Sequence, residues 1–296
     1  MLFRLFLSGW LVALLSLAAA AQTMGRVEHL PDFASKFVQP RHVDVWLPEG
    51  YVPGKKYPVL YMHDGQNLFS PKTSYGGVAW EVDSVLTQLQ REKKVPAYIV
   101  VGIWNSPKRF AEYTPEKPFR NLPPARQQAF QEEYHAGPLS DAYLKFLVEE
   151  LKPYIDQHYQ TKPDRKHTFI MGSSMGGLIS LYAALEYPQV FGGAGCLSTH
   201  WPLSLQSNTP DFTNAMVQYL EQKLPRRHKP RLYFDYGTTT LDALYEPHQQ
   251  RIDAVLRARG YDARHWQTRR FEGAAHNEAA WQQRLTIPLE FLLGKK

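Results

Sequence analysis

The chain has 296 residues, a formal net charge of +6 and a single cysteine, Cys196. Its basic residues form only short, scattered clusters, whereas a nucleic-acid-binding surface has a dense basic stripe, so no nucleic-acid partner is indicated. One cysteine excludes an intrachain disulfide. The sequence contains no CxxC, HExxH or other dense ligand cluster, so it indicates no metal site.

Residues 1–21 have the pattern of a secretory signal peptide. Arg4 supplies a positive start, residues 5–17 are an apolar run, and the alanines before Gln22 offer an A-x-A cleavage site. The alternative is an uncleaved anchor, but the apolar run is short for a membrane span. We expect an exported protein, periplasmic or secreted, that begins near Gln22 and has no stable membrane insertion after cleavage.

The remaining residues, 22–296, suit one α/β domain. In chain order we expect a strand over 41–47, a buried strand over 57–62, a helix over 79–92, a buried strand over 97–103, a helix over 140–159 with Ser140 as its N-cap, a strand over 167–171, a helix over 175–187, a strand over 191–197, a helix over 211–223, a strand over 231–236, a helix over 242–259, a strand over 264–270 and a helix over 278–293. This alternation predicts a mostly parallel central sheet with helices on both faces.

Residues 106–139 interrupt this alternation. The segment is rich in proline and polar residues, starts just past the end of a predicted strand and is too long for an ordinary connection. Insertions at such positions commonly cover or shape a site. The alternative is a surface loop without a role in a site.

The most informative stretch is residues 167–181, HTFIMGSSMGGLISL. It places a G-x-S-x-G motif between a predicted strand and a predicted helix, the context in which the central serine is a nucleophile. We therefore assign Ser174 as the nucleophile and the backbone N–H of Met175 as one oxyanion donor. The alternative is a glycine-rich turn without chemistry.

A nucleophilic serine needs a histidine base and an acid that orients it, and in this fold class the chain order is serine, acid, histidine. His276 lies between a predicted strand and a helix among small residues, so we assign it as the base. Asp242 is our choice for the acid, because it follows the strand over 231–236. Asp235, inside that strand, and Glu246, in the next helix, remain alternatives.

The second oxyanion donor should come from the loop after the strand over 57–62. We assign the N–H of Gln66, because Gly65 allows a close backbone approach, and we expect Asp64 to brace the loop.

Several motifs together resemble the putative esterase family, the esterase-D-like group of α/β-hydrolases. They are YPVLYMHDGQNLF, VVGIWN with Arg109 and Tyr113, ELKPYID, GSSMGG and GAAHNEAAW, and they cover essentially all of the chain after the signal. The group includes feruloyl and acetyl-xylan esterases, S-formylglutathione hydrolase, mycolyltransferases and trilactone siderophore esterases. The resemblance implies an α/β-hydrolase fold, a Ser-His-acid triad and no cofactor. Ser174 and His276 match the family pattern, whereas threonines stand where members often carry the acid.

These observations predict an exported serine esterase that forms an acyl-enzyme, acting on small-molecule or carbohydrate-linked esters, such as acylated carbohydrates or aromatic acyl esters. The alternatives are a siderophore trilactone esterase and a non-catalytic binding protein on a hydrolase scaffold. Residues near strand ends could line an aromatic cleft: Trp80, Trp104, Arg109, His200 and Trp201. The tryptophans could instead belong to the core, and Arg109 could pair with Glu112 or Glu116.

Overall fold

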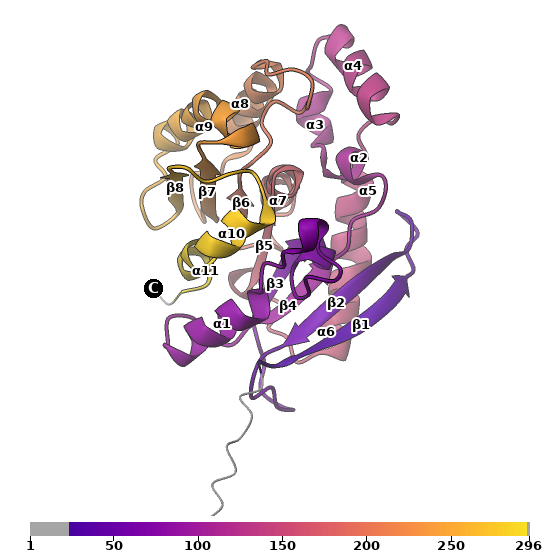
Figure 1. Cartoon of the computed structure of the whole chain (residues 1–296), viewed down its shortest axis with the longest axis vertical. Helices are drawn as coiled ribbons and strands as arrows, with labels where there is room; N and C mark the ends of the chain where they lie inside the picture. Colours follow the sequence, from indigo (N-terminus) through magenta and orange to yellow (C-terminus); the bar gives the residue numbers. More distant parts are fainter. Residues whose placement is uncertain (1–23, 295–296) are drawn as a thin grey trace, which may run out of the picture.

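The computed structural model describes residues 24–294, so the predicted signal peptide lies outside the described residues. Eight strands form one sheet in the order β1-β2-β4-β3-β5-β6-β7-β8 (Figure 1). They are β1 Arg26–Phe33, β2 Arg41–Leu47, β3 Val59–His63, β4 Ile99–Ile103, β5 Thr168–Ser173, β6 Gly193–Leu197, β7 Arg231–Gly237 and β8 Trp266–Phe271. At one edge of the sheet, β2 pairs antiparallel with both β1 and β4. The six strands β3 to β8 are parallel to one another. This is the mostly parallel sheet predicted from the sequence.

Alternation along the strands divides the core into two layers. In β3, Val59 and Tyr61 belong to one buried cluster, and Leu60 and Met62 belong to the other. Successive side chains of a strand point to opposite faces, so a continuous apolar run requires cover on both sides.

Helices supply that cover. One face packs against α5 Ser140–Lys145, η3 Phe146–Leu151, α6 Lys152–His158, α7 Met175–Glu186, α8 Asp211–Lys223 and α9 Glu246–Ala258. The other packs against α1 Val82–Arg91, α10 Glu278–Arg284 and α11 Thr286–Leu293. Within residues 24–294, no helix is both long enough and apolar enough to cross a bilayer.

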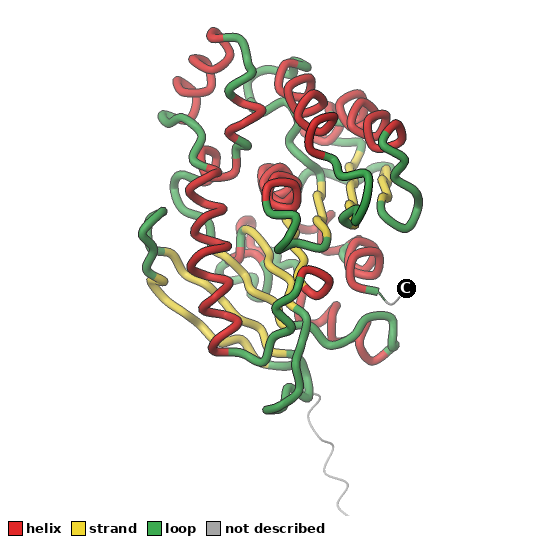
Figure 2. Tube along the Cα trace, turned by 180° about the vertical axis from the view of Figure 1, so that it is seen from behind, coloured by secondary structure: helices red, strands yellow, loops and turns green. Residues whose placement is uncertain are grey.

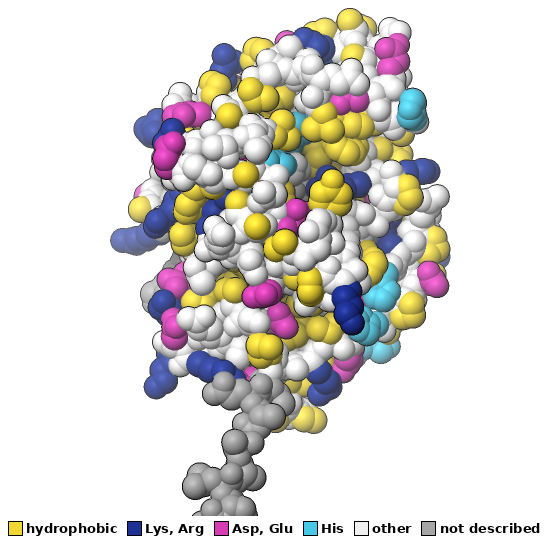
Figure 3. All heavy atoms as spheres, viewed as in Figure 1, with side chains coloured by type: hydrophobic (Ala, Val, Ile, Leu, Met, Phe, Trp, Pro, Cys, Tyr) yellow, Lys and Arg dark blue, Asp and Glu magenta, His cyan; other side chains and the backbone are white. Residues whose placement is uncertain are grey.

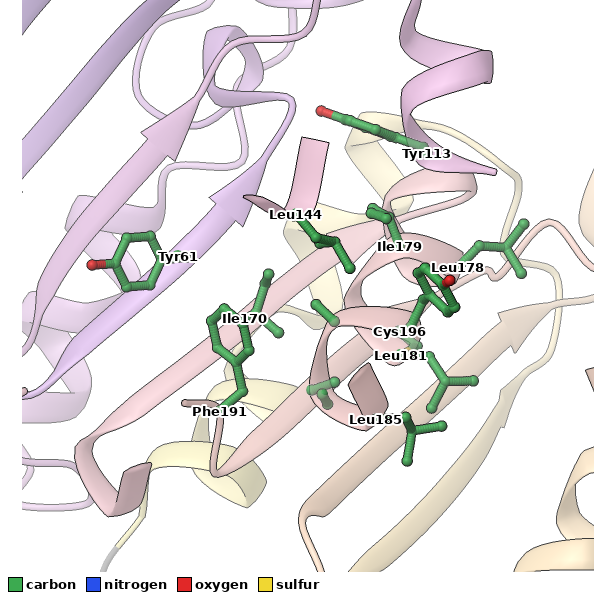
Figure 4. Packing of buried hydrophobic residues seen from close by; sticks show 14 of the residues in the cluster. Tyr61, Tyr113, Leu144, Ile170, Leu178, Ile179, Leu181, Leu185, Phe191 and Cys196 are labelled. Carbon is green, nitrogen blue, oxygen red and sulfur yellow. The ribbon is translucent and has the colours of Figure 1, made fainter. Parts of the chain in front are cut away.

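Helix α7 is the most deeply buried of these helices. Its residues from Met175 to Leu185 are all buried, and Leu178, Ile179 and Leu181 pack among residues of the sheet (Figure 4). Cys196 is buried in the same cluster. Burial raises the pKa of its thiol well above the usual value, so the thiol is a packing group. This rigid helix fixes the position of the turn that precedes it.

Several predicted boundaries need correction. The predicted helix over 140–159 is continuous (Figure 2), but it contains a π-helical turn, η3, and Ser140 is its first residue instead of its N-cap. The hydroxyl of Ser140 instead accepts a hydrogen bond from the N–H of Glu116.

The expected helix over 242–259 begins at Glu246, because residues 240–244 form the separate turn η5 Thr240–Leu244. The expected helix over 278–293 is divided into α10 and α11. Strand β1 was not predicted, because its residues are either exposed or only partly buried and show no buried run.

The insertion over residues 106–139 is ordered by short helices: α2 Arg109–Tyr113, α3 Glu116–Phe119 and α4 Pro124–Tyr134. It is tied to the segment after β6. Arg126 pairs with Asp211 at 2.7 Å, and the carboxylate of Glu133 accepts hydrogen bonds from the hydroxyl of Ser204 and the N–H of Leu205. Both segments start at carboxyl ends of parallel strands, the edge at which α/β sheets bind ligands.

Candidate active site

Ser174 lies in the sharp turn between β5 and α7, with φ 57° and ψ −120°. A residue other than glycine is strained in this region, so the surrounding structure must hold it there. The N–H of Ser174 donates to the carbonyl of Leu197 at 2.8 Å, and its own carbonyl accepts from the N–H of His200 at 3.2 Å. A Cβ at Gly172 would lie 2.9 Å from the backbone of Gly176, so the turn requires glycine there.

His276 lies in the loop between β8 and α10. Its Nδ1 is 2.6 Å from Oδ1 of Asp242, and its backbone N–H donates to the hydroxyl of Thr240 at 2.8 Å. The imidazole stands edge-on between the rings of Trp281 and Tyr245, with centroids 5.0 and 5.7 Å away. These contacts fix the ring plane and leave Nε2 free of the carboxylate.

Asp242 is fully buried, and its two oxygens have different partners. Oδ1 faces His276, while Oδ2 accepts hydrogen bonds from the hydroxyl of Ser198 and the N–H of Gly237, both at 2.6 Å. Burial alone would raise the pKa of this carboxyl, but the bonds from His276, Ser198 and Gly237 outweigh it and hold the pKa below its usual value. The group is therefore a carboxylate in the neutral pH range.

The other two candidate acids lie elsewhere. Asp235 is buried inside β7, where Arg284 donates to its Oδ1 at 3.0 Å, and burial raises its pKa despite that contact. Glu246 is partly exposed at the start of α9 and pairs with Arg270. Of the three carboxyl groups considered, only that of Asp242 is hydrogen-bonded to His276.

A buried support behind Asp242 had no signal in the sequence. The hydroxyl of Ser198 donates to Asp242 and accepts from Nη2 of Arg284 at 2.8 Å and from Nε1 of Trp281 at 2.9 Å. Ser198 follows β6, whereas Arg284 and Trp281 lie in α10. These residues carry no shared motif, so only the fold could reveal that they meet.

The loop after β3 forms η1 Gly65–Asn67 and lies against the turn of Ser174. A Cβ at Gly65 would be 2.5 Å from the carbonyl carbon of Gly102, so only glycine allows this approach, and a Cβ at Gly176 would be 3.5 Å from Oδ2 of Asp64. Gln66 and Met175 both lie in the first turn of a helix, where the N–H groups have no acceptor within the helix. Among the backbone hydrogen bonds of residues 24–294 outside the helices and strands, none has either N–H as its donor. Both N–H groups are available to another acceptor.

Asp64 and Arg109 form a bidentate ion pair beside this loop. Nε donates to Oδ1 at 2.7 Å and Nη2 to Oδ2 at 2.8 Å, and the amide of Asn105 adds a third bond to Oδ1. Burial would raise the pKa of Asp64, but Arg109 and Asn105 lower it below its usual value. Asp64 braces the loop, as the sequence indicated.

The partners considered for Arg109 were wrong. Glu112 makes a bidentate pair with Arg41 instead, and Glu116 pairs with Arg120. Arg109 pairs with Asp64 instead, so it supports the loop.

The aromatic residues proposed as a cleft wall lie mostly in the core. Trp80 and Trp201 are 2% and 1% exposed and belong to the two hydrophobic clusters. His200 is fully buried, with Nδ1 2.7 Å from the hydroxyl of Tyr245, and burial lowers its pKa to about 3. Trp104 is half-buried and donates from Nε1 to Asp44 at 2.8 Å. The structure therefore gives no support to a wall built from these tryptophans.

The surface view nevertheless shows a hollow in the molecule, between the part that carries α3 and α4 and the part that carries β3 and α10 (Figure 3). Histidine and cationic side chains are visible in it beside hydrophobic ones. The carboxyl ends of the parallel strands β3, β5 and β7 lie at the same edge of the sheet.

Three solved or curated proteins illustrate what the chain is similar to. It is 30% identical over 171 residues to the ferri-bacillibactin esterase BesA of Bacillus subtilis, covering 54% of each chain. The enterobactin esterase FES of Shigella flexneri, solved in the presence of enterobactin, superposes with a TM-score of 0.68 at 17% identity, covering 90% of this chain and 58% of that one. The ferulic acid esterase AmCE1/Fae1A of Anaeromyces mucronatus, in complex with ferulic acid, gives a TM-score of 0.60 at 20% identity, covering 91% of each chain.

The chain spans 54–59% of the length of three curated relatives that it matches. The solved structures share its fold, that of α/β-hydrolase esterases. A family model described as "Putative esterase" matches residues 34–292, which is most of the chain. The chain belongs to this esterase family.

Proposed function

We propose that the protein is a serine hydrolase of carboxylic esters with Ser174 as its nucleophile. The observation that carries this proposal is the backbone of Ser174, held at φ 57° and ψ −120° between a strand and a helix. Such strain is maintained where it exposes a reactive side chain. The pairing of His276 with Asp242 at 2.6 Å supports the proposal, because a serine needs a base with a fixed tautomer.

In the proposed mechanism, the hydroxyl oxygen of Ser174 attacks the ester carbonyl while Nε2 of His276 accepts its proton. Asp242 keeps the other proton on Nδ1 and stabilises the imidazolium. The N–H groups of Met175 and Gln66 donate to the oxyanion of the tetrahedral intermediate. His276 then protonates the leaving alcohol, and the same residue activates the water that hydrolyses the acyl-enzyme. No cofactor takes part in this scheme.

The test is covalent labelling combined with matched serine variants. A fluorophosphonate should label the parental protein at Ser174, and Ser174→Ala should abolish labelling and lower kcat for p-nitrophenyl acetate by roughly 10³–10⁶. Ser173→Ala is the control, because Ser173 is the neighbouring buried serine at the end of β5. Parental turnover by Ser174→Ala would instead favour a non-catalytic binding protein with adventitious hydrolysis.

For the substrate, we propose esters that carry a hydroxylated aromatic ring. The names of the similar proteins include ferulic acid, enterobactin and bacillibactin. In this chain the insertion contributes Phe110 and Tyr134, which stack with ring centroids 4.2 Å apart. The insertion is joined to the segment after β6, which contains His200, and His200 contacts the turn of Ser174. An aromatic group bound to the insertion would thus lie on the side of the nucleophile.

Three substrates separate the possibilities: methyl ferulate, acetylated xylan and an enterobactin-like trilactone. We expect a higher kcat/KM for methyl ferulate or the trilactone than for acetylated xylan. The faster of the two aromatic substrates identifies a feruloyl-type esterase or a siderophore esterase. If all three are inert while short aryl esters react quickly, the aromatic-substrate proposal fails and a general esterase remains.

We also propose that the protein is exported, on the basis of the signal-like pattern in residues 1–21. Expression of the full chain in a bacterium, followed by fractionation and N-terminal sequencing, should find a periplasmic or secreted form that begins near Gln22. A cytoplasmic product that retains residue 1 would contradict this proposal.

A further inference from the structure

Outside the candidate active site, His29, His42 and Asp44 meet on the antiparallel edge of the sheet. His42 and Asp44 are two residues apart on β2, so they point to the same face. The pairing of β1 with β2 places His29 directly opposite Asp44. Histidine side chains are visible over this edge (Figure 3). The sequence showed no ligand spacing here, because strand pairing brings the third residue into the group.

The three potential ligand atoms already converge. Nδ1 of His29 and Nε2 of His42 lie 2.5 and 2.7 Å from the same oxygen, Oδ1 of Asp44, and all three atoms lie within 4.8 Å of one another. Within residues 24–294, this is the only group of three or more histidine, cysteine or acidic side chains with this convergence. Where another histidine pairs with a carboxylate, the pair has one histidine, as with His265 and Asp262 at 2.7 Å.

The group also has the surroundings of a metal site. Nε1 of Trp104 donates to Oδ2 of Asp44 at 2.8 Å, so it orients the carboxylate and leaves Oδ1 toward the histidines. Hydrogen bonds of this kind hold metal ligands in place. The side chain of Asp44 is 6% exposed, whereas that of His29 is 64% exposed. The carboxylate is therefore fixed, and the site opens to solvent on the side of His29.

We propose that His29, His42 and Asp44 bind a divalent transition-metal ion of the zinc class. Two imidazoles and one carboxylate match the ligand preference of Zn²⁺, and similar donor sets take Ni²⁺ or Cu²⁺. Water occupies the remaining coordination position on the open side.

The required rearrangement is small. In a tetrahedral zinc site with ligands at about 2.0–2.1 Å, neighbouring ligand atoms stand roughly 3.3 Å apart. The imidazole nitrogens must therefore move away from Oδ1 by less than about 1 Å, and they must stand roughly 3.3 Å from each other, where they now lie within 4.8 Å. The His29 and His42 side chains are 64% and 26% exposed, which leaves both room to rotate. The two strands already hold the backbone of all three ligands in register.

The bound ion joins β1 to β2. Strand β1 buries little of its surface, and it pairs with β2 at the edge of the sheet. A ligand from each strand would hold this edge in place, since a metal that binds only the folded state stabilises that state. The proposal does not depend on ester hydrolysis, because none of its ligands belongs to the proposed triad.

The test is zinc titration of untagged protein that has first been treated with EDTA. Calorimetry should find one saturable site per chain, and His29→Gln and His42→Gln should each raise Kd for Zn²⁺ at least tenfold. His265→Gln, in the two-membered pair with Asp262, should leave Kd within twofold. At zinc concentrations near 100 Kd, Tm of the parental protein should rise by at least about 5 °C, and EDTA should reverse the rise.

Hydrogen exchange locates the effect. Zinc should slow amide exchange in β1 of the parental protein and should leave it unchanged in His29→Gln. Because the side chain of His29 is exposed, this variant should fold normally, so lost binding would reflect the lost ligand. Absence of saturable zinc uptake, or uptake that neither His29→Gln nor His42→Gln weakens, would overturn the proposal. Adventitious binding at other surface histidines would give zinc uptake that neither variant weakens.

Discussion

Ser198 donates a hydrogen bond from its hydroxyl to Oδ2 of Asp242 at 2.6 Å, on the opposite side of the carboxylate from His276. The same hydroxyl accepts bonds from Arg284 and Trp281. Two residues of α10 thus fix Ser198, and Ser198 in turn fixes the acid of the proposed triad.

Replacing Ser198 should impair catalysis through the position of Asp242. Ser198→Ala removes the bond to Oδ2 and leaves the donors of Arg284 and Trp281 without their acceptor, which should lower the free energy of unfolding by about 1–3 kcal/mol. We expect kcat for p-nitrophenyl acetate to fall about tenfold, equivalent to about 1.4 kcal/mol, with little change in KM. Steady-state kinetics and urea unfolding measure the two effects.

The control for this variant is Ser180→Ala. Ser180 is also fully buried, but its hydroxyl donates to the carbonyl of Gly176 within α7. This variant should lose stability without a comparable fall in kcat. Equal losses of kcat in both variants would show that Ser198 has no specific positioning role.

The identity of the acid can be tested with three isosteric changes. Asp242→Asn should lower kcat by up to about 10⁴, because the amide no longer favours the required tautomer of His276. Asp235→Asn should act mainly on stability, since Asp235 binds Arg284 inside the core. Glu246→Gln, at the partly exposed start of α9, should change neither kcat nor stability. A larger fall in kcat for Asp235→Asn than for Asp242→Asn would contradict the assignment.

Breaking the pair of Asp64 with Arg109 should destabilise the protein in a pH-dependent way. Arg109→Gln leaves a buried carboxylate without its main partner, at a cost of about 3 kcal/mol near pH 7. The native pKa of Asp64 lies below its unfolded value, so its stabilising contribution exists above the unfolded pKa and disappears as the pH falls through the native pKa. The stability difference between the two proteins should therefore shrink as the pH falls below the unfolded pKa, and it should vanish only below the lower native pKa of Asp64.

The matched control is Arg126→Gln. Arg126 pairs with Asp211 at the same 2.7 Å, but the two side chains are 37% and 34% exposed. An exposed pair contributes about 0–1 kcal/mol. Chemical denaturation at several pH values should therefore separate the two variants. Equal, small effects would show that burial does not strengthen the pair of Asp64.

Glu278 should give the opposite pH dependence. Burial and the nearby Asp64 raise its pKa, and its Oε1 accepts a bond from the amide of Asn67 at 3.3 Å. A carboxyl with a raised native pKa loses stability as the pH rises from its unfolded pKa through its native pKa, and the full cost applies above the native pKa. Glu278→Gln should therefore be as stable as the parental protein near pH 4 and more stable, by up to about 1 kcal/mol, near pH 8.

Thermal unfolding across that pH range measures this effect. Glu221→Gln, on the exposed side of α8, is the control and should show no such trend. A variant of Glu278 that is less stable at high pH than at low pH, relative to the parental protein, would show that the carboxylate forms a favourable contact.

The sequence alone determined the features that depend on local backbone and on burial. The strand-turn-helix context of Ser174 is encoded in neighbouring residues, because small residues and a buried helix force one turn geometry. Continuous apolar runs likewise predicted the strands that are covered on both faces. Strand β1 has no such run, and it was missed for that reason.

The tertiary structure decided which side chains meet. Asp235, Asp242 and Glu246 all lie near the end of β7, and only the turn η5 brings Asp242 to His276. Asp64 follows β3 and Arg109 lies beyond β4, and the pairing of these two strands brings the side chains together. The register of β1 with β2 gathered His29 with Asp44. Contacts between distant residues depend on register and loop path, which no short stretch of sequence encodes, whereas a turn is fixed by the residues within it.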